Sequence, residues 1–242
     1  MNITTYILGS AYIMMSIFRL SNNFTTYLFN NDIINLPLSK YEKINECIYS
    51  SIHGVIVTAM ASISTLYMNT TIFNYNPNII EKDNSLQYFT ISFCLSYFIF
   101  DLLKCLYYQK YLFILHHLAA INLLILTIYS FYNNENKGFY AIYLIFLLES
   151  NTILLNIGFL LKEFKFHYSI TCTMWIIHLF FFNLFRIITL PRILFIYFYN
   201  EQWTLINIYK LPSFILIYTG SVYWSYRQTI GIHKYLKENC VI

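Results

Sequence analysis

Two adjacent histidines, His116 and His117, lie inside the apolar run FILHHLAAIN of residues 113–122. An imidazole can take up or release a proton near neutral pH, but burial in a bilayer without a polar partner is costly. Because neighbours on a helix point about 100° apart, the two rings cannot easily bind one metal ion or face one cavity equally. We therefore expect one histidine to carry the chemistry and the other to support it.

A second polar group precedes the histidines, in the stretch SYFIFDLLK. Tyr97 and Asp101 are four residues apart and Lys104 follows three later, which places all three on one helical face. The tyrosine hydroxyl can cap the carboxylate and the lysine can neutralise it. Asp101 and Lys104 can equally form an ion pair near a helix end, with the lysine reaching towards water.

Later apolar stretches carry further polar side chains at helical spacing. The residues in question are Glu149, Thr152 and Asn156 in LLESNTILLN, and His178, Asn183 and Arg186 in WIIHLFFFNLFRIITLPR. Polar stripes on consecutive membrane helices predict a shared interior cavity or network. A purely structural interpretation also stands, in which Arg186 pairs with a carboxylate such as Glu149 and His178 bonds a neighbouring helix.

The composition is that of an integral membrane protein. Of the 242 residues, 58% are hydrophobic and 11% are charged, and the mean hydropathy is +0.53; soluble domains carry about 25% charged residues. The net charge of +4 is dispersed, so nucleic acid is not an expected partner. The five cysteines stand singly without metal-ligand spacing, so we expect small hydrophobic side chains, no metal site and no cofactor.

Apolar stretches of roughly 20 residues can cross about 30 Å of hydrocarbon as helices. They lie at residues 3–20, 47–68, 86–107, 112–132, 139–161, 167–190 and 203–226, and polar segments, one of them around Pro191, separate them. The sequence therefore predicts an all-α polytopic membrane protein, a bundle of about seven transmembrane helices. The Lys and Arg bias of the loops predicts a luminal N-terminus and a cytosolic C-terminus.

These motifs resemble the TLC-domain family of multi-pass membrane proteins, which includes the ceramide synthases. The resemblance rests on SIHG with His53, SYFIFDLLK, FILHHLAA, and LLESNT followed by FFNLFRIITLP, in that order. It implies a six-helix TLC core over residues 45–230. An N-terminal transmembrane helix and cytosolic loop over 1–44 would precede it, and a short cytosolic tail over 231–242 would follow.

The resemblance also implies a location in the endoplasmic reticulum and a role with lipids or with proteins destined for sorting. In the ceramide synthases the paired histidines are required for transfer of a fatty acyl group from acyl-CoA to a sphingoid amine. His116, His117 and Asp101 are thereby the catalytic candidates: one histidine acts as general base or acyl carrier, and Asp101 orients it. Acyl-CoA would be the substrate.

One stretch departs from the ceramide synthases. Where they carry His-Asp-x-x-Asp, this chain reads LLESN at residues 147–151. The departure makes the chain more similar to the TLC-domain-containing subfamily 4 type, formerly called transmembrane protein 56, and weighs against ceramide synthesis.

We therefore expect a protein of membrane lipid homeostasis that binds an acyl chain or lipid in an intramembrane cavity, with N-acyltransferase activity left open. The candidate lipid-binding residues are Tyr97, Glu149, Asn156, His178 and Arg186. Arg186 is expected to meet a phosphate or carboxylate head group. The alternative is a non-enzymatic cargo receptor or translocation partner that binds membrane-protein clients. A proton path through Glu149, His178 and Arg186 is less favoured because the acidic residues form no continuous relay.

Overall fold

A computed structural model describes residues 3–28, 38–67, 85–132, 138–200 and 205–239, and every regular element in these ranges is helical. The elements are α1 (Ile3–Leu28), α2 (Leu38–Tyr67), α3 (Ser85–Tyr107), α4 (Tyr111–Tyr132), α5 (Gly138–Glu163), α6 (Tyr168–Phe182), the π-helical segment η2 (Asn183–Thr189), α7 (Leu190–Asn200) and α8 (Leu205–Asn239). The last three residues of the predicted tail lie outside the described ranges. The all-helical prediction is confirmed.

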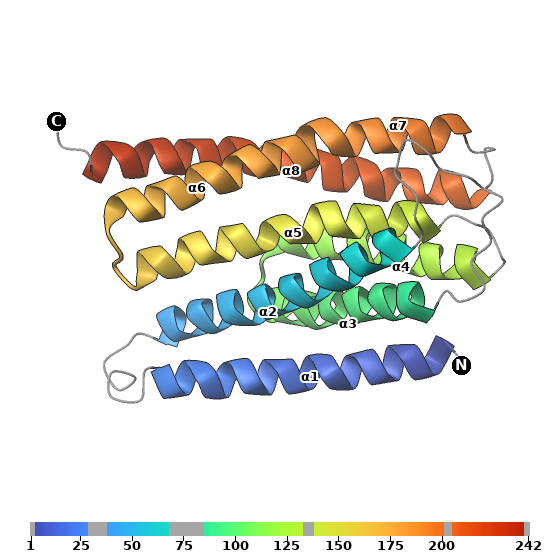
Figure 1. The fold of residues 1–242 in the computed structure, drawn as a ribbon, viewed down its shortest axis with the longest axis horizontal. Coiled ribbons are helices and arrows are strands. Elements are labelled where there is room, and N and C mark those ends of the chain that lie inside the picture. The colour runs from blue at the N-terminus through green and yellow to red at the C-terminus, as the bar shows by residue number, and fades with distance from the viewer. Residues whose placement is uncertain (1–2, 29–37, 68–84, 133–137, 201–204, 240–242) are drawn as a thin grey trace.

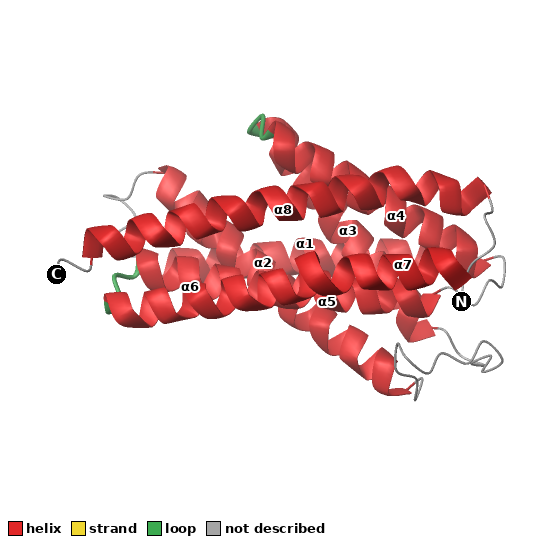
Figure 2. Cartoon of the chain, turned by 90° about the horizontal axis from the view of Figure 1, so that it is seen from above, coloured by secondary structure: helices red, strands yellow, loops and turns green. Residues whose placement is uncertain are grey.

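The helices lie roughly along one common axis (Figure 1). Since α6, η2 and α7 follow one another without a break, they form a single rod. This rod and α8 lie along one side of the bundle and α1 along the opposite side (Figures 1 and 2). Helices α2, α3, α4 and α5 lie between them, and the most extensive helix contact joins α2 to α5.

Five helical segments in the described ranges are long and apolar enough to cross a membrane. They are Lys40–Thr65, Ser85–Tyr107, Tyr111–Ser130, Ile142–Glu163 and Tyr168–Phe195. The first predicted span, 3–20, falls in α1, and the described part of the last, 205–226, falls in α8; both helices belong to the same bundle but are not among these five. The chain is therefore a multi-pass membrane protein.

Helices α1 and α2 extend into the region expected to be a loop, residues 21–46. Polar side chains bridge the two helices there. The Ser21 hydroxyl donates to Oδ1 of Asn45 at 2.8 Å, and the Tyr41 hydroxyl donates to Oδ1 of Asn22 at 2.8 Å. Apolar composition marks the part of a helix that suits hydrocarbon, whereas the backbone hydrogen bonding continues beyond it.

The helix also continues through Pro191, where the sequence predicted a break. Proline lacks an N–H, and in a helix its ring clashes with the carbonyl four residues earlier. The chain relieves that clash by widening into the π-helical turn η2, in which the N–H of Leu190 donates to the carbonyl of Phe185. The result is a distortion inside the rod instead of a loop.

Two tight turns, α3–α4 and α5–α6, have the same construction. The residues Gln109 and Lys165 adopt left-handed conformations, with φ of 54° and 55°. In the first turn the N–H of Lys110 donates to the carbonyl of Cys105 at 2.9 Å, and that of Gln109 to Leu106 at 3.2 Å. This Schellman pattern satisfies the last carbonyls of α3 and sets its final turns against the start of α4.

The packed core lies among the first five helices. Its fully buried members include Met14, Tyr49, Phe93 and Ile142, one from each of α1, α2, α3 and α5. At the α5–α6 contact, the indole of Trp175 lies so close to Gly158 that a Cβ there would be 2.2 Å from Cδ1 of the ring. The core therefore holds the helices that carry the polar residues at fixed separations.

Candidate functional site

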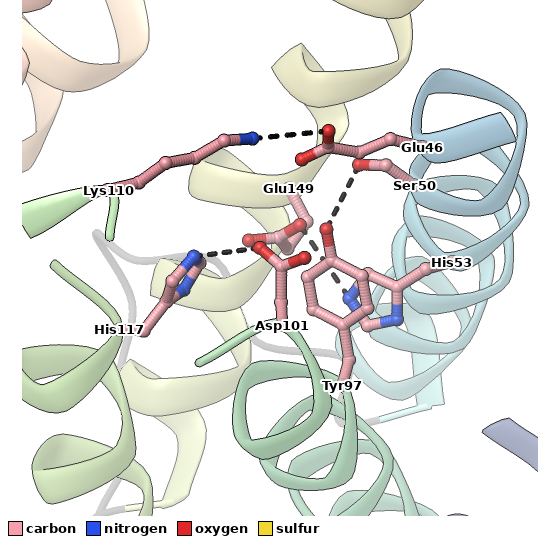
Figure 3. A network of polar contacts seen from close by, with 8 residues as sticks. All are labelled: Glu46, Ser50, His53, Tyr97, Asp101, Lys110, His117 and Glu149. Atoms are coloured by element: carbon pink, nitrogen blue, oxygen red, sulfur yellow. Dashed lines mark hydrogen bonds and ion pairs between the residues drawn. The ribbon is translucent and has the colours of Figure 1, made fainter. Parts of the chain in front are cut away.

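Side chains from four helices meet in one buried polar network (Figure 3). His53 comes from α2, Tyr97 and Asp101 from α3, His117 from α4 and Glu149 from α5. All five are buried. The structure thus brings together the predicted residues of three separate motifs.

Asp101 pairs with His117. Its Oδ2 lies 2.8 Å from Nε2 of the imidazole, off the direction of the ring N–H. The tight α3–α4 turn explains this proximity, because Asp101 lies in the last turns of α3 and His117 in the second turn of α4. A carboxylate at this position can fix the orientation and tautomer of an imidazole.

Lys104 does not take the carboxylate, as one interpretation of the sequence expected. Its Nζ lies 4.7 Å from the ring centroids of Phe18 and Tyr49, and 5.2 Å from that of Phe100. Three aromatic faces from α1, α2 and α3 thereby attract the ammonium group. Asp101 therefore pairs with His117 and not with Lys104. The contact between Lys104 and Phe18 joins α3 to α1.

Tyr97 and His53 form a stack between α3 and α2. Their ring centroids are 3.7 Å apart at an interplanar angle of 6°, and the Tyr97 hydroxyl donates to Oγ of Ser50 at 3.1 Å. On the other side, Nε2 of His53 lies 3.7 Å from Oε2 of Glu149. His53 therefore links the tyrosine to the carboxylate of α5.

An apolar cavity adjoins this network. About 670 Å³ of empty space lies within it, counted with its open mouth. Its walls are mostly aliphatic and aromatic side chains of α3, α4, α5 and α8, such as Phe98, Leu124, Leu148 and Phe214. Such a surface suits a hydrocarbon chain and offers little to a polar solute.

Three polar side chains that can bear charge reach the same cavity: His116, Glu149 and Arg186. Nδ1 of His116 is buried without a hydrogen-bond partner among the described residues. The ring of His116 contacts Trp224 edge to face, with centroids 4.9 Å apart. The adjacent histidines therefore differ in environment: His116 lines the cavity, while His117 lies behind it against Asp101.

Arg186 reaches the cavity from the π-helical segment. It does not form the expected ion pair with Glu149, since no nitrogen of the guanidinium comes within 4.0 Å of that carboxylate; instead Nη2 donates to the carbonyl of Leu148. Its Nε has no hydrogen-bond partner among the described residues. A buried guanidinium with an unpaired N–H group can donate a hydrogen bond to an anionic group.

The remaining predicted lipid-binding residues are buried outside the cavity lining. Nε2 of His178 lies 3.2 Å from Oε1 of Gln228 on α8, and Nδ2 of Asn156 has no partner among the described residues. Tyr97 contributes through its stack on His53. His178 and Tyr97 therefore support helix contacts, and none of the three side chains lines the cavity.

Sequence reasoning assigned no site role to Trp224, Ser50 or His53. Trp224 lies on α8, more than 100 residues after His116. No spacing rule joins residues on helices so far apart in sequence, because their proximity is set by how the rods pack. The one sequence feature that could have indicated a site role for His53 was the SIHG stretch of the family resemblance.

The chain matches the family model of the TLC domain over residues 43–228. It belongs to the TLC-domain family. The match covers most of α2, all of α3 to α7 and most of α8, and thus every residue of the network and the cavity lining. Searches of curated proteins and of solved structures found no match.

Proposed function

We propose that this TLC-domain protein acts in membrane lipid homeostasis by binding a fatty acyl chain or lipid in the cavity between α4, α5 and α8. The observation that carries the proposal is an apolar cavity that His116, Glu149 and Arg186 also line. A single-chain amphiphile matches that distribution, with its hydrocarbon against the leucines and its head group beside Arg186. The membrane proposed is that of the endoplasmic reticulum, with the C-terminus cytosolic.

The test measures which lipids stay with the purified protein. Ala120→Phe fills the cavity from α4, whereas Leu118→Phe adds a ring to the exposed face of the same helix. Native mass spectrometry of the wild type is expected to show a retained acyl lipid, which Ala120→Phe loses and Leu118→Phe keeps. Equal retention by both variants, with unchanged circular dichroism, would refute binding in this cavity.

An enzymatic form of the proposal is favoured by His116, whose ring lines the cavity and whose Nδ1 has no partner among the described residues. In this form the imidazole acts as general base towards an amine, or attacks the acyl-CoA thioester so that CoA thiolate leaves. The amine then takes the acyl group as an amide and loses a proton. His117, paired with Asp101, would position its neighbour.

Labelled acyl-CoA supplied to membranes that contain wild type, His116→Ala or His117→Ala tests this form. We expect His116→Ala to lower formation of the labelled lipid by about 100- to 10,000-fold, the usual contribution of a general acid or base, and His117→Ala to lower it less. Untargeted lipid mass spectrometry identifies the acceptor. Identical profiles at equal expression would leave lipid binding without catalysis.

A further inference from the structure

The last turns of α3 and the start of α4 bring together three different metal-ligating side chains. The donor atoms of Asp101, Cys105 and His117 lie within 4.8 Å of one another, and all three residues are buried. Asp101 and Cys105 are four residues apart on one helical face, and His117 comes from across the tight turn. We propose that these residues form a zinc-binding site.

The donor set fits a divalent ion of intermediate softness. Zn²⁺ takes thiolate, imidazole and carboxylate ligands, and three protein ligands leave a fourth position for water or another ligand. In a tetrahedral site the donor atoms lie about 3.3–3.6 Å apart, from bond lengths of about 2.0 Å to nitrogen and oxygen and about 2.3 Å to sulfur. The Asp101–His117 contact, at 2.8 Å, is shorter than this range, and all the donor atoms lie within 4.8 Å of one another, so metal binding requires rotation of these side chains.

Charge balance favours the ion in this apolar setting. A carboxylate and a thiolate together neutralise Zn²⁺, and the neutral imidazole adds no charge, so the complex buries no net charge. Binding replaces the thiol proton of Cys105, which leaves to water. Lys104, the nearest cation on α3, points to the rings of Phe18, Tyr49 and Phe100 instead of into the site.

The surroundings of the two ring nitrogens of His117 also favour binding of a zinc ion. Both ring nitrogens are buried and neither makes an aligned hydrogen bond within the described residues. The backbone of Cys105 is fixed, because its carbonyl accepts the N–H of Lys110 in the turn. Cysteine spacing along the sequence did not suggest this site, since its ligands are of three residue types on two helices.

The zinc site is separate from the lipid-binding cavity, although it shares Asp101 and His117 with the enzymatic form of the proposed function. Neither Cys105, Asp101 nor His117 lines the cavity. Zinc content and retained lipid are measured on the same preparation, so either proposal can fail while the other holds.

The experiment uses the full chain in lipid nanodiscs, stripped with a chelator and titrated with Zn²⁺ and then with Co²⁺ as a spectroscopic probe. We expect one equivalent of metal and a thiolate-to-cobalt charge-transfer band. The band should disappear in Cys105→Ala and persist in Cys94→Ala, which removes a buried thiol from the same helix. His117→Ala keeps the thiol and should weaken zinc binding more than about 100-fold, since loss of an outer partner alone costs 10–100-fold.

Two results would overturn the site. One is a wild type that takes up no stoichiometric metal or shows no thiolate band. The other is a band of full strength in Cys105→Ala. If Cys105→Ala loses the circular dichroism of a helical protein, the zinc titration of His117→Ala becomes the deciding test. A zinc affinity of His117→Ala equal to that of the wild type would then overturn the site.

Discussion

Arg186 combines burial, positive charge and unused hydrogen-bond donors. One nitrogen bonds the Leu148 carbonyl, Nε has no partner among the described residues, and the guanidinium lies 5.1 Å from the Phe182 ring. Structural arginines in membrane helices pair with a carboxylate or with several carbonyls. An arginine held mainly by one carbonyl and one aromatic face is suited to exchange part of that environment for a ligand.

We therefore expect Arg186→Met to weaken retention of anionic lipids by about 10- to 100-fold, as hydrogen bonds to a charged group contribute about 1.5–3 kcal/mol. Methionine keeps most of the side-chain length and apolar contact. Native mass spectrometry of protein incubated with matched anionic and zwitterionic lipids gives the measurement.

Arg192→Met is the control, because it removes the same charge from an exposed position on the same rod. It should leave the lipid preference unchanged. An equal loss in both variants would mean that overall charge, and not the cavity, selects the lipid.

The site was partly predictable from residue types. Polar residues in apolar runs identified His116, Glu149 and Arg186, because an ionisable side chain in a membrane helix requires a partner or a function. Their partners were not predictable. Glu149 was expected to meet Arg186, but its Oε2 lies 3.7 Å from Nε2 of His53, since interhelical contacts depend on packing angles that spacing along one helix does not encode.

Gly158 shows at the scale of single helices why α5 and α6 pack so closely. A Cβ at this position would overlap the Trp175 indole, at 2.2 Å from Cδ1 and 2.3 Å from Nε1. Gly158→Ala is therefore expected to lower the free energy of unfolding by about 1–3 kcal/mol, as overpacking does.

Gly231→Ala provides the contrasting substitution, because nothing lies within 4 Å of the added Cβ on α8. It should raise stability by about 0.5–1 kcal/mol through helix propensity. Thermal unfolding in detergent compares the two. A Gly158→Ala protein as stable as the wild type would show that Trp175 moves aside without cost.

The π-helical turn sets the direction in which Arg186 points. Arg186 and Leu190 both line the cavity across this segment. Pro191→Ala restores an N–H and permits a regular α-helix, which turns the residues on one side of the segment by about 100° relative to those on the other. Arg186 and Leu190 are four residues apart and share a face in a regular helix, so both would turn together relative to the start of α6 and away from the cavity.

Pro191→Ala should accordingly lose lipid retention while its stability stays equal to the wild type or rises by about 0.5–1.5 kcal/mol, the value of one restored hydrogen bond. Native mass spectrometry and thermal unfolding of the same sample give both quantities. Retained lipid at full occupancy would show that the π turn has no role in the site.

The fold was largely predictable at the scale of the whole molecule. Hydrocarbon thickness sets span length, so the predicted 86–107 and 112–132 agree closely with α3 and α4. The prediction missed the helix through Pro191 and the polar extensions of α1 and α2. Both depend on local hydrogen bonding, which composition does not report.

One end of the bundle gathers charged contacts. Glu163 lies 3.4 Å from Lys40 and 3.7 Å from Lys43, and Glu46 lies 3.4 Å from Lys110. If this end is cytosolic, as the loop charges predict, a cysteine at Gln109 should react with a membrane-impermeant maleimide added from the cytosolic side.

A cysteine at Thr4, near the other end of α1, should react only from the luminal side. A Cys240→Ser background removes the tail thiol, and the four described native cysteines are buried. Intact and permeabilised microsomes distinguish the two faces. Reaction of both positions from the same side would contradict the proposed topology.

The short α3–α4 turn also bears on how the chain enters the bilayer. Asp101 and His117 belong to the two arms of one hairpin, joined by the turn at Tyr108–Lys110. Hydrocarbon disfavours either side chain alone, whereas a hairpin that inserts as a unit carries the acid and its partner together. Biosynthesis can thus place an ionisable pair in the bilayer before α5 and the later helices arrive to shield it.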